Sequence, residues 1–531
     1  MQRDTGLMER VFLGASVRTM DPEIPCADTV IVRDRQIVQV CRWGEMDPAP
    51  APGTDREVYD LRGMAILPGF VDAHIHFTQM VWERSLLDFS NVGSLGQLRD
   101  RLASARRERG SGEWIIGRRI NPLLLDEIRD GGGRIVSDGL GAGPVILGTA
   151  DGHTALLDAK GAEILHADHA LATIPDRSIE PNGDFLVFKE EAASAAWEWI
   201  ETREKALVPE AIEDGLDLLH SRGITAIHTF ERIRDWPALG ENGARRRGLR
   251  TAVGIYEADL PAVISSGGRL PGNELALGGL KLFIDGTLGS RTALLFEPWE
   301  GEARGSMTAP PPARHSAIVR RARRNGIGLC LHAIGDRAVR VALDLLQEAA
   351  GEGAGPTADR IEHVQLIHPA DLGRFGGLGV IASVQPAHII GDRQLAEAAW
   401  GRRCRWAYPY RSLIRSGARL AFGSDAPYGE TDPLQAIRIA VTRRAGGGEP
   451  WYPEERISVE EAFTAHTVNG AVASGWERDA GRLIAGLPAD MVVLSRDPFR
   501  SETDLEKTEV VATVVGGEAV WGLEKLPRFN S

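Results

Sequence analysis

Apolar runs recur through the middle of the chain, and most are followed by a helical pattern. Each run ends in polar residues or glycine. We count eight of them, and they begin at Ala65, Pro144, Gly223, Leu280, Ile327, Arg360, Gly379 and Arg419. Nearly continuous apolar runs are typical of parallel strands that are buried on both faces. Eight strand-then-helix units therefore predict an α/β fold, a TIM-type (β/α)8 barrel.

The two ends of the chain have a different pattern, with short runs of alternating β-branched residues. These runs cover residues 11–14, 29–33 and 36–40 near one end, and 490–495, 509–515 and 519–521 near the other. Such alternation favours strands over helices. Neither end makes a domain alone, so we expect one small β-sandwich built from both termini, residues 1–66 plus 478–531. The barrel then spans 67–477, and two inserts at about 77–143 and 154–210 are predicted to cover its mouth.

Composition narrows the classes of protein that this chain can belong to. Of its 531 residues, 43% are hydrophobic and 25% are charged, which is enough apolar material for a large core. The net charge of −13 argues against a nucleic-acid partner. We find no apolar run of the roughly 20 residues that a membrane helix needs, and no signal-peptide pattern. The four cysteines form no CxxC motif, so we expect reduced thiols and a cytoplasmic protein.

The ends of the apolar runs carry residues that can bind a metal. His74 and His76 are two positions apart, which on a strand places both imidazoles on one face. His332, His363 and Asp425 each close a separate run. A histidine near a buried strand is usually a hydrogen-bonded core residue, but that explanation does not account for four imidazoles and a carboxylate at one end of a barrel. These ligand types suit Zn, with Fe and Mn as alternatives.

Lys281 stands out because it lies within an apolar run and the chain has only six lysines. Burial of an unpaired ammonium is costly, so such a lysine readily loses its proton. The neutral amine can react with CO2, and the resulting carbamate can bridge two metal ions. The alternative is an ordinary ion pair with Asp285 or Asp425.

The chain resembles the amidohydrolase superfamily over essentially its whole length. The motifs that carry the resemblance are residues 67–76, Lys281, His332, His363, residues 423–425 and residues 481–494. Residues 151–153, 285–293, 332–336 and 383–388 are similar to the YtcJ-like branch, which includes N-substituted formamide deformylases.

The resemblance implies a role for each of these residues. His74 and His76 would bind one metal, His332 and His363 a second, and a carboxylated Lys281 would bridge them. Asp425 would bind the first metal and act as the general base. Members of the superfamily use one or two ions, and many are homodimers.

The function that we expect is hydrolysis of a carbon–nitrogen bond, amide or N-formyl, in a small molecule. The candidate substrate-binding residues are His153, Arg291, Gln385 and His388, although Arg291 could instead pair with Asp285. The same metal site would also serve hydrolysis of a cyclic amidine, an ester or a carbamate, or an isomerisation or hydration. A third hypothesis is a catalytically inactive binding protein, and the intact set of six metal-site residues argues against it.

Overall fold

The computed structural model divides the protein into two compact units. One contains residues 1–78 and 212–531, and the other contains residues 79–211. The residues that the structure describes are 7–46, 54–110, 112–128, 136, 143–149, 154–169, 171–172, 178–182, 184–189, 191–205, 207–240, 248–270, 275–302, 312–353, 355, 357–445 and 448–529.

The larger unit contains an eight-stranded parallel sheet that curls into a nearly closed barrel. Its strands run in the order β19-β18-β17-β16-β15-β14-β13-β6. Their bounds are β6 (Phe70–Ile75), β13 (Ile224–Phe230), β14 (Arg250–Tyr256), β15 (Ala276–Phe283), β16 (Leu329–Ala333), β17 (Arg360–His363), β18 (Ile381–Val384) and β19 (Arg419–Phe422). Close to the end of β19, the backbone nitrogen of Asp425 donates to the carbonyl of His74 in β6, so the two ends of the sheet meet. The predicted α/β barrel is thus confirmed.

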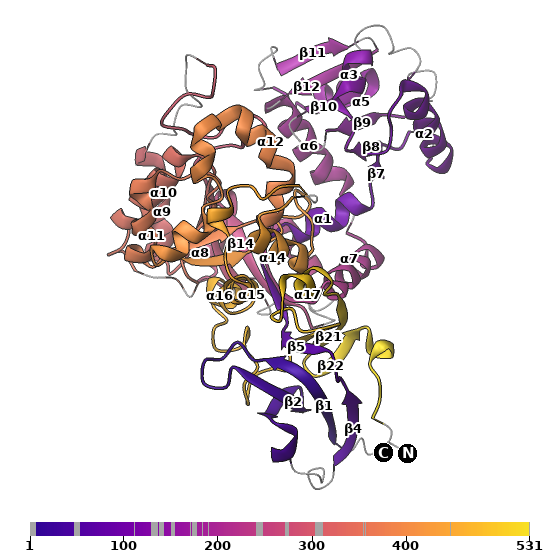
Figure 1. The fold of residues 1–531 in the computed structure, drawn as a ribbon. Helices are drawn as coiled ribbons and strands as arrows, with labels where there is room; N and C mark the ends of the chain where they lie inside the picture. The colour runs from indigo at the N-terminus through magenta and orange to yellow at the C-terminus, as the bar shows by residue number, and fades with distance from the viewer. Residues whose placement is uncertain are drawn as a thin grey trace. The chain divides into compact units, whose positions relative to one another are not determined.

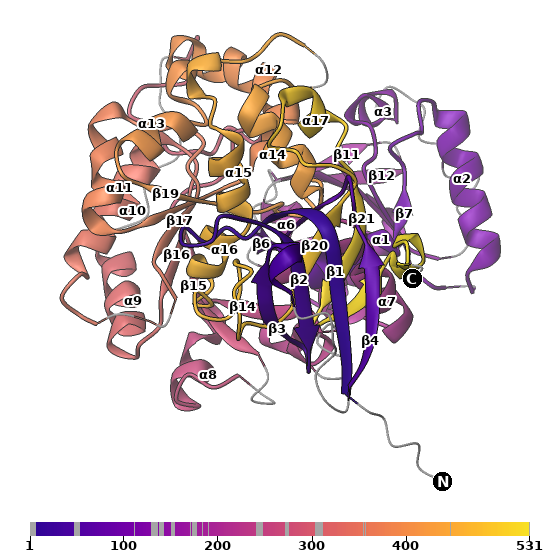
Figure 2. The same ribbon diagram turned by 60° about the horizontal axis from the view of Figure 1, so that its bottom comes forward.

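Helices between the strands pack their apolar faces on the barrel. These include α8 (Leu260–Ser265), α9 (Pro312–Arg324), α10 (Asp336–Glu348), α11 (Leu372–Leu378), α12 (Ile389–Trp400), α13 (Tyr410–Arg415), α14 (Pro433–Thr442), α15 (Val459–His466) and α16 (Val468–Ala473). Helix α10 lies beside α9 and α11 in Figures 1 and 2. It buries Ala338, Val339, Ala342, Leu343 and Leu346, which form the apolar stripe that the sequence predicts.

One strand assignment from the sequence is wrong. The run that begins at Pro144 forms β9 (Val145–Gly148), which pairs with β8 (Ile115–Arg118) and β10 (Thr154–Asp158) in the smaller unit and not with the barrel. The barrel strand that the apolar runs do not predict is β14, in which threonine, glycine and tyrosine interrupt the apolar pattern. A short apolar run looks the same in either sheet, because periodicity reports burial and not the neighbouring strand.

Strands from both ends of the chain form a second sheet in the larger unit. They are β1 (Leu7–Arg18), β2 (Cys26–Arg33), β3 (Gln36–Cys41), β4 (Thr54–Asp60), β5 (Ala65–Pro68), β20 (Met491–Leu494), β21 (Val510–Val515) and β22 (Glu518–Trp521). The two ends join where β5 pairs antiparallel with β20, and Figure 2 shows the indigo and yellow strands together. This sheet and the barrel belong to the same compact unit. A separate sandwich with the bounds 1–66 plus 478–531 therefore stays a prediction.

The smaller unit is a six-stranded sheet with an apolar core on each face. Its strands are β7 (Leu87–Asp88), β8 (Ile115–Arg118), β9, β10 (Thr154–Asp158), β11 (Ile179–Asn182) and β12 (Phe185–Lys189). Its helices include α2 (Leu95–Glu108), α3 (Pro122–Glu127), α5 (Ala159–Ala167) and α6 (Glu191–Glu204). Ile115 lies in one core and Ile116 in the other, as strand alternation requires. Both predicted inserts thus belong to one folded unit, together with the strand between them.

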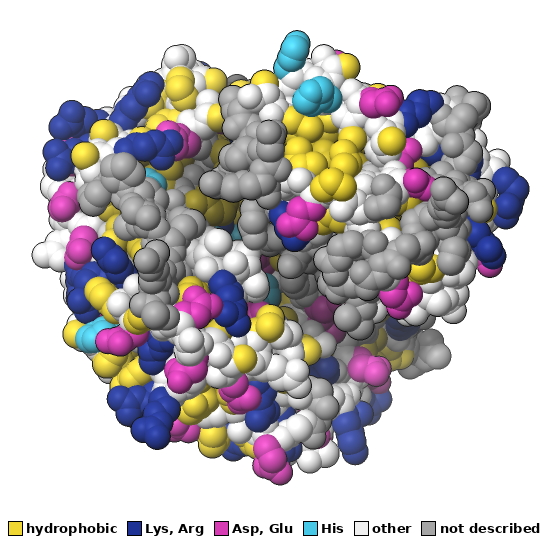
Figure 3. Space-filling model, turned by 90° about the horizontal axis from the view of Figure 1, so that it is seen from above, with side chains coloured by type: hydrophobic (Ala, Val, Ile, Leu, Met, Phe, Trp, Pro, Cys, Tyr) yellow, Lys and Arg dark blue, Asp and Glu magenta, His cyan; other side chains and the backbone are white. Residues whose placement is uncertain are grey.

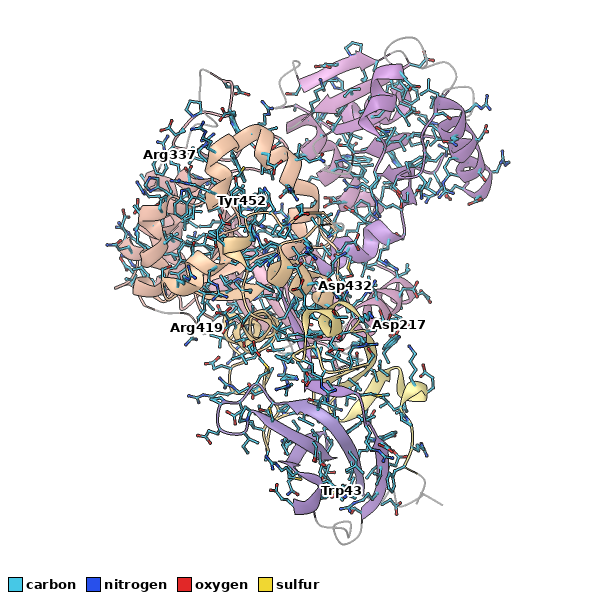
Figure 4. The ribbon with its side chains drawn as sticks, in the orientation of Figure 1. Trp43, Asp217, Arg337, Arg419, Asp432 and Tyr452 are labelled. Carbon is cyan, nitrogen blue, oxygen red and sulfur yellow. The ribbon has the colours of Figure 1, made fainter. Side chains whose placement is uncertain are left out.

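The surface carries charges of both signs. On the face drawn in Figure 3, Lys and Arg side chains alternate with Asp and Glu, and the described residues there form no broad area of one charge. Arg419, labelled in Figure 4, is exposed at the start of β19, whereas the rest of that strand is buried. In the described part of the chain, no helix combines the length and the apolar character that a membrane crossing requires.

Candidate metal centre

The structure brings together the six side chains that the sequence predicts as metal-site residues. One ligand atom from each of His74, His363 and Asp425 lies within 4.8 Å of the other two. His76 Nε2 is 3.2 Å from Asp425 Oδ1, and Lys281 Nζ is 3.2 Å from His74 Nε2. The ring centroid of His332 is 4.5 Å from that of His363. The cluster lies where the barrel strands end, which is where barrel enzymes carry their active sites.

The backbone around the cluster is strained where its ligands are presented. His363 and Asp425 have φ angles of 75° and 57°, in the left-handed region that non-glycine residues seldom adopt. Gly423 allows β19 to approach β6, because a Cβ at this position would lie 2.5 Å from the nitrogen of His74. Asp72 joins the two strand ends, since its Oδ1 accepts hydrogen bonds from the backbone nitrogens of His74 and Ser424. Burial raises the pKa of Asp72 to about 6.

Burial favours the neutral form of His74, His332 and His363, which is the form that binds a metal. It lowers the pKa of His332 to about 3, and the nearby Lys281 adds to the effect. The pKa of His74 is lowered by burial and then by Lys281. Burial also lowers the pKa of His363 well below its ordinary value, and the nearby His332 adds to the effect.

His74, His332 and His363 each use one ring nitrogen as a donor, so the other nitrogen of each ring is an acceptor. His74 Nδ1 donates to Glu362 Oε2 at 2.6 Å, and His363 Nδ1 donates to Gln385 Oε1 at 2.8 Å. His332 Nε2 donates to the carbonyl of Gly286 at 3.1 Å. Partners of this kind orient metal-binding histidines and fix which nitrogen carries the proton. The remaining ring nitrogens therefore present lone pairs.

The lone pairs in the cluster fit a bound cation. With its proton on Nδ1, His74 presents an acceptor at Nε2, and this atom lies 3.3 Å from the acceptor Asp425 Oδ1. Two acceptors that face each other in a buried site are stabilised by a donor or a positive charge beside them, and Lys281 Nζ, 3.2 Å from His74 Nε2, is such a donor in the structure. Two imidazoles and a carboxylate are ligands that zinc and similar divalent metals prefer. The residues present thus fit a metal.

Lys281 is not in an ordinary ion pair. Its side chain is buried, and among the described residues no carboxylate oxygen lies within 4.0 Å of Nζ. The oxygens of Asp285 instead accept three backbone hydrogen bonds, from Leu294, Ile334 and Gly335. Burial lowers the pKa of Lys281, which favours the neutral amine. The structure thus leaves Lys281 without the ion pair that was its alternative explanation.

The four candidate substrate-binding residues lie in different surroundings. Gln385 contacts His363, and His388 Nε2 lies 3.7 Å from Asp425 Oδ2. Arg291 is exposed and pairs with Glu302 at 2.6 Å, and among the described residues no hydrogen bond or ion pair joins its side chain to the cluster or to Asp285. His153 lies outside the described residues.

Two charged residues of this site were missed in the sequence. Glu362 and Arg360 lie in β17, both are fully buried, and Arg360 Nε donates to Glu362 Oε1 at 2.6 Å. Burial alone would raise the pKa of Glu362, but Arg360, His74 and Lys281 together outweigh burial and hold that pKa well below its ordinary value. Two opposite charges at i and i+2 in a buried strand were the signal that could have identified them.

Aromatic residues also surround the cluster and were not predicted. The Phe283 ring lies 5.0 Å from that of His332, and the Tyr428 ring lies 5.8 Å from that of His76. Both side chains are about half exposed. They place partly exposed aromatic surface beside the cluster.

A parallel barrel with buried imidazoles and a carboxylate at the ends of its strands is the arrangement typical of metal-dependent barrel enzymes. The chain belongs to the amidohydrolase family, whose model (Amidohydro_3) matches residues 57–521. The resemblance expected from the motifs, to this family and to its YtcJ-like members, is confirmed.

Three relatives show how far the similarity extends. The chain is 28% identical to the protein LONG AFTER FAR-RED 3 of Arabidopsis thaliana, over 95% of this chain and 90% of that protein. It is 25% identical to N-substituted formamide deformylase of Arthrobacter pascens, over 97% of this chain and 98% of that enzyme. A solved structure of an uncharacterized metal-dependent hydrolase from Pyrococcus furiosus matches with a TM-score of 0.75 and 25% identity, over 93% of this chain and 100% of that one.

Proposed function

We propose that the protein is a metal-dependent hydrolase that cleaves a carbon–nitrogen bond, amide or N-formyl, in a small molecule. The observation that carries the proposal is the buried cluster of His74, His363 and Asp425 at the carboxyl end of an amidohydrolase barrel. The similarity to N-substituted formamide deformylase over almost the whole of both chains supports the choice of bond.

The residues of the cluster divide between two metal positions. His74, His76 and Asp425 would hold one ion, and His332 with His363 would hold a second. Lys281 would bridge them as a carbamate, and its burial and lack of an ion pair support this role. Zinc is the metal that we propose, because imidazole and carboxylate ligands suit it. When bound, such a metal supplies Lewis acidity and lowers the pKa of water to about 7.

The protein's own residues then move the proton and orient the substrate. Asp425 accepts the proton from the attacking water through a carboxylate oxygen and returns it to the leaving nitrogen as the carbon–nitrogen bond breaks. His388 Nε2 is buried, has no hydrogen-bond partner among the described residues, and lies 3.7 Å from Asp425 Oδ2. We propose that this nitrogen binds the substrate's carbonyl oxygen. The products are a carboxylic acid, or formic acid, and an amine.

Metal content per chain tests this function directly. We expect zinc in protein purified without chelator, and an intact mass with a CO2 adduct that is lost on acidification. A panel of N-formyl and N-acyl amines then identifies substrates by the amine released. Protein that binds no divalent metal after reconstitution would overturn the proposal.

A further inference from the structure

We propose that Glu362, oriented by Arg360, is a positioning residue that keeps the proton of His74 on Nδ1 and so leaves Nε2 free to bind the metal. The inference rests on the proposed metal function. It adds a role for two residues that touch neither the metal positions nor the substrate.

Short hydrogen bonds connect the side chains of His74, Glu362 and Arg360 in one buried line. Glu362 Oε2 accepts from His74 Nδ1 at 2.6 Å, and Glu362 Oε1 accepts from Arg360 Nε at 2.6 Å. All three side chains are fully buried. A carboxylate has no proton to donate, so this geometry allows only one arrangement, with the proton on Nδ1 of His74.

Arg360 also ties the line to the backbone beside the metal ligand. Its second terminal nitrogen donates to the carbonyl of Ala73 at 2.6 Å, directly before His74. Its first terminal nitrogen lies 3.2 Å from His228 Nδ1. The guanidinium therefore fixes both the carboxylate that contacts the His74 ring and the strand that carries that ring.

Stability alone does not explain a charged pair at this place. A buried ion pair is often no more stable than well-packed apolar side chains of similar volume. Charged groups inside a barrel therefore indicate a constraint other than packing. Here the constraint is the orientation and the protonated nitrogen of a metal ligand, which is the effect that such hydrogen-bond partners have on metal sites.

The substitution Glu362→Gln separates this role from mere packing. Arg360 can only donate, so the amide oxygen of the glutamine must face Arg360. The amide NH2 group must then face His74 Nδ1, which has to become an acceptor. The proton of His74 moves to Nε2, and that nitrogen can no longer bind a metal. A substitution that hardly changes the side-chain volume thus moves the proton of His74 from one ring nitrogen to the other.

The experiment measures zinc affinity of the full-length protein by competition with a chromophoric chelator. We expect Glu362→Gln to raise the dissociation constant for zinc by about 10–100-fold, with Glu362→Asp between that variant and the wild type. Glu9→Gln is the matched control, because Glu9 is also buried and accepts from two arginines, Arg33 and Arg56, far from the cluster. We expect this control to lose stability and to keep its zinc affinity.

The outcomes distinguish the inference from the proposed function. A wild type that binds zinc while Glu362→Gln binds it equally well would overturn the inference and leave the function intact. A wild type that binds no zinc would overturn both. If Glu362→Gln does not fold, neutron diffraction of the metal-free wild type locates the proton of His74. Density for it on Nδ1 supports the inference, and density on Nε2 overturns it.

Discussion

The backbone nitrogen of Asp425 donates a hydrogen bond of 2.6 Å to the carbonyl oxygen of His74. The two residues are far apart in the sequence. His74 belongs to β6, the first strand of the barrel, and Asp425 follows β19, the last strand. Barrel closure therefore also assembles the cluster. Asp425 remains in the left-handed region of backbone space because this contact and its buried surroundings hold it there.

We expect Asp425→Asn to abolish turnover while the protein stays folded. The carboxamide cannot accept the proton of the attacking water, so kcat should fall by about 10²–10⁴-fold. The measurement is kcat on an N-formyl or N-acyl substrate, with metal content determined on the same sample. Asp432→Asn is the control, because Asp432 (Figure 4) caps α14 and asparagine caps equally well. Activity close to that of the wild type in Asp425→Asn would refute the assigned base.

We expect Lys281→Ala to lose one metal ion and to recover part of its activity when a short carboxylic acid is added. The added carboxylate takes the place of the carbamate in the space that the side chain leaves. The measurement is metal content and rate with and without the acid. Lys525→Ala is the control, since Lys525 contacts Trp521 in the terminal sheet region and lies outside the cluster. Unchanged metal content would show that Lys281 does not bridge metals.

We expect Gly423→Ala to destabilise the fold by about 1–3 kcal/mol and to reduce metal binding. Its Cβ would lie 2.5 Å from the backbone nitrogen of His74 and would push β19 away from β6. Urea denaturation measures the change in the free energy of unfolding. Gly377→Ala in α11 has open space around the new methyl group and should gain about 0.5–1 kcal/mol. Equal effects of the two substitutions would contradict the close approach at Gly423.

We expect Glu9 to make the stability of the fold depend on pH in acid. Burial alone would raise its pKa, but hydrogen bonds from Arg33 and Arg56 outweigh burial and lower the pKa below its ordinary value of 4.5. A group with a lowered folded pKa stabilises the protein above its unfolded pKa, and this stability is lost as the pH falls through the folded pKa.

The free energy of unfolding of the wild type and of Glu9→Gln, measured from neutral pH to below pH 4, checks the sign. The difference between the two proteins should be largest at neutral pH and should shrink in acid. A difference that grows as the pH falls would show that the pKa shift has the opposite direction.

We expect Phe283→Ala to weaken substrate binding more than it slows turnover. The ring is about half exposed beside His332, so an apolar part of a substrate can cover it. Loss of roughly 1.4 kcal/mol of apolar contact corresponds to about a tenfold increase in KM. Phe529→Ala removes a similarly exposed ring near the end of the chain and serves as the control. A fall in kcat with unchanged KM would contradict this role.

Much of the architecture could be read from local patterns. An apolar run is buried in the folded protein whichever strand it pairs with, so the parallel barrel and the strands at both ends of the chain were predictable. The metal-site residues were equally visible, because His74, Lys281, His332 and His363 are polar groups in or at the ends of apolar runs. Burial of a polar group without a partner costs free energy, so a polar residue within an apolar run indicates a role other than packing.

Which strands pair with each other is decided only by the tertiary structure. Periodicity could not tell that β9 belongs to the smaller unit or that β14 completes the barrel, because strand order arises from contacts between distant segments. Nor could it show that Asp285 binds backbone amides while Lys281 lies against His74. Arg360, Glu362 and His74 meet only when β17 and β6 face each other across the closed barrel, since hydrogen bonds of this kind require a geometry that no local pattern encodes.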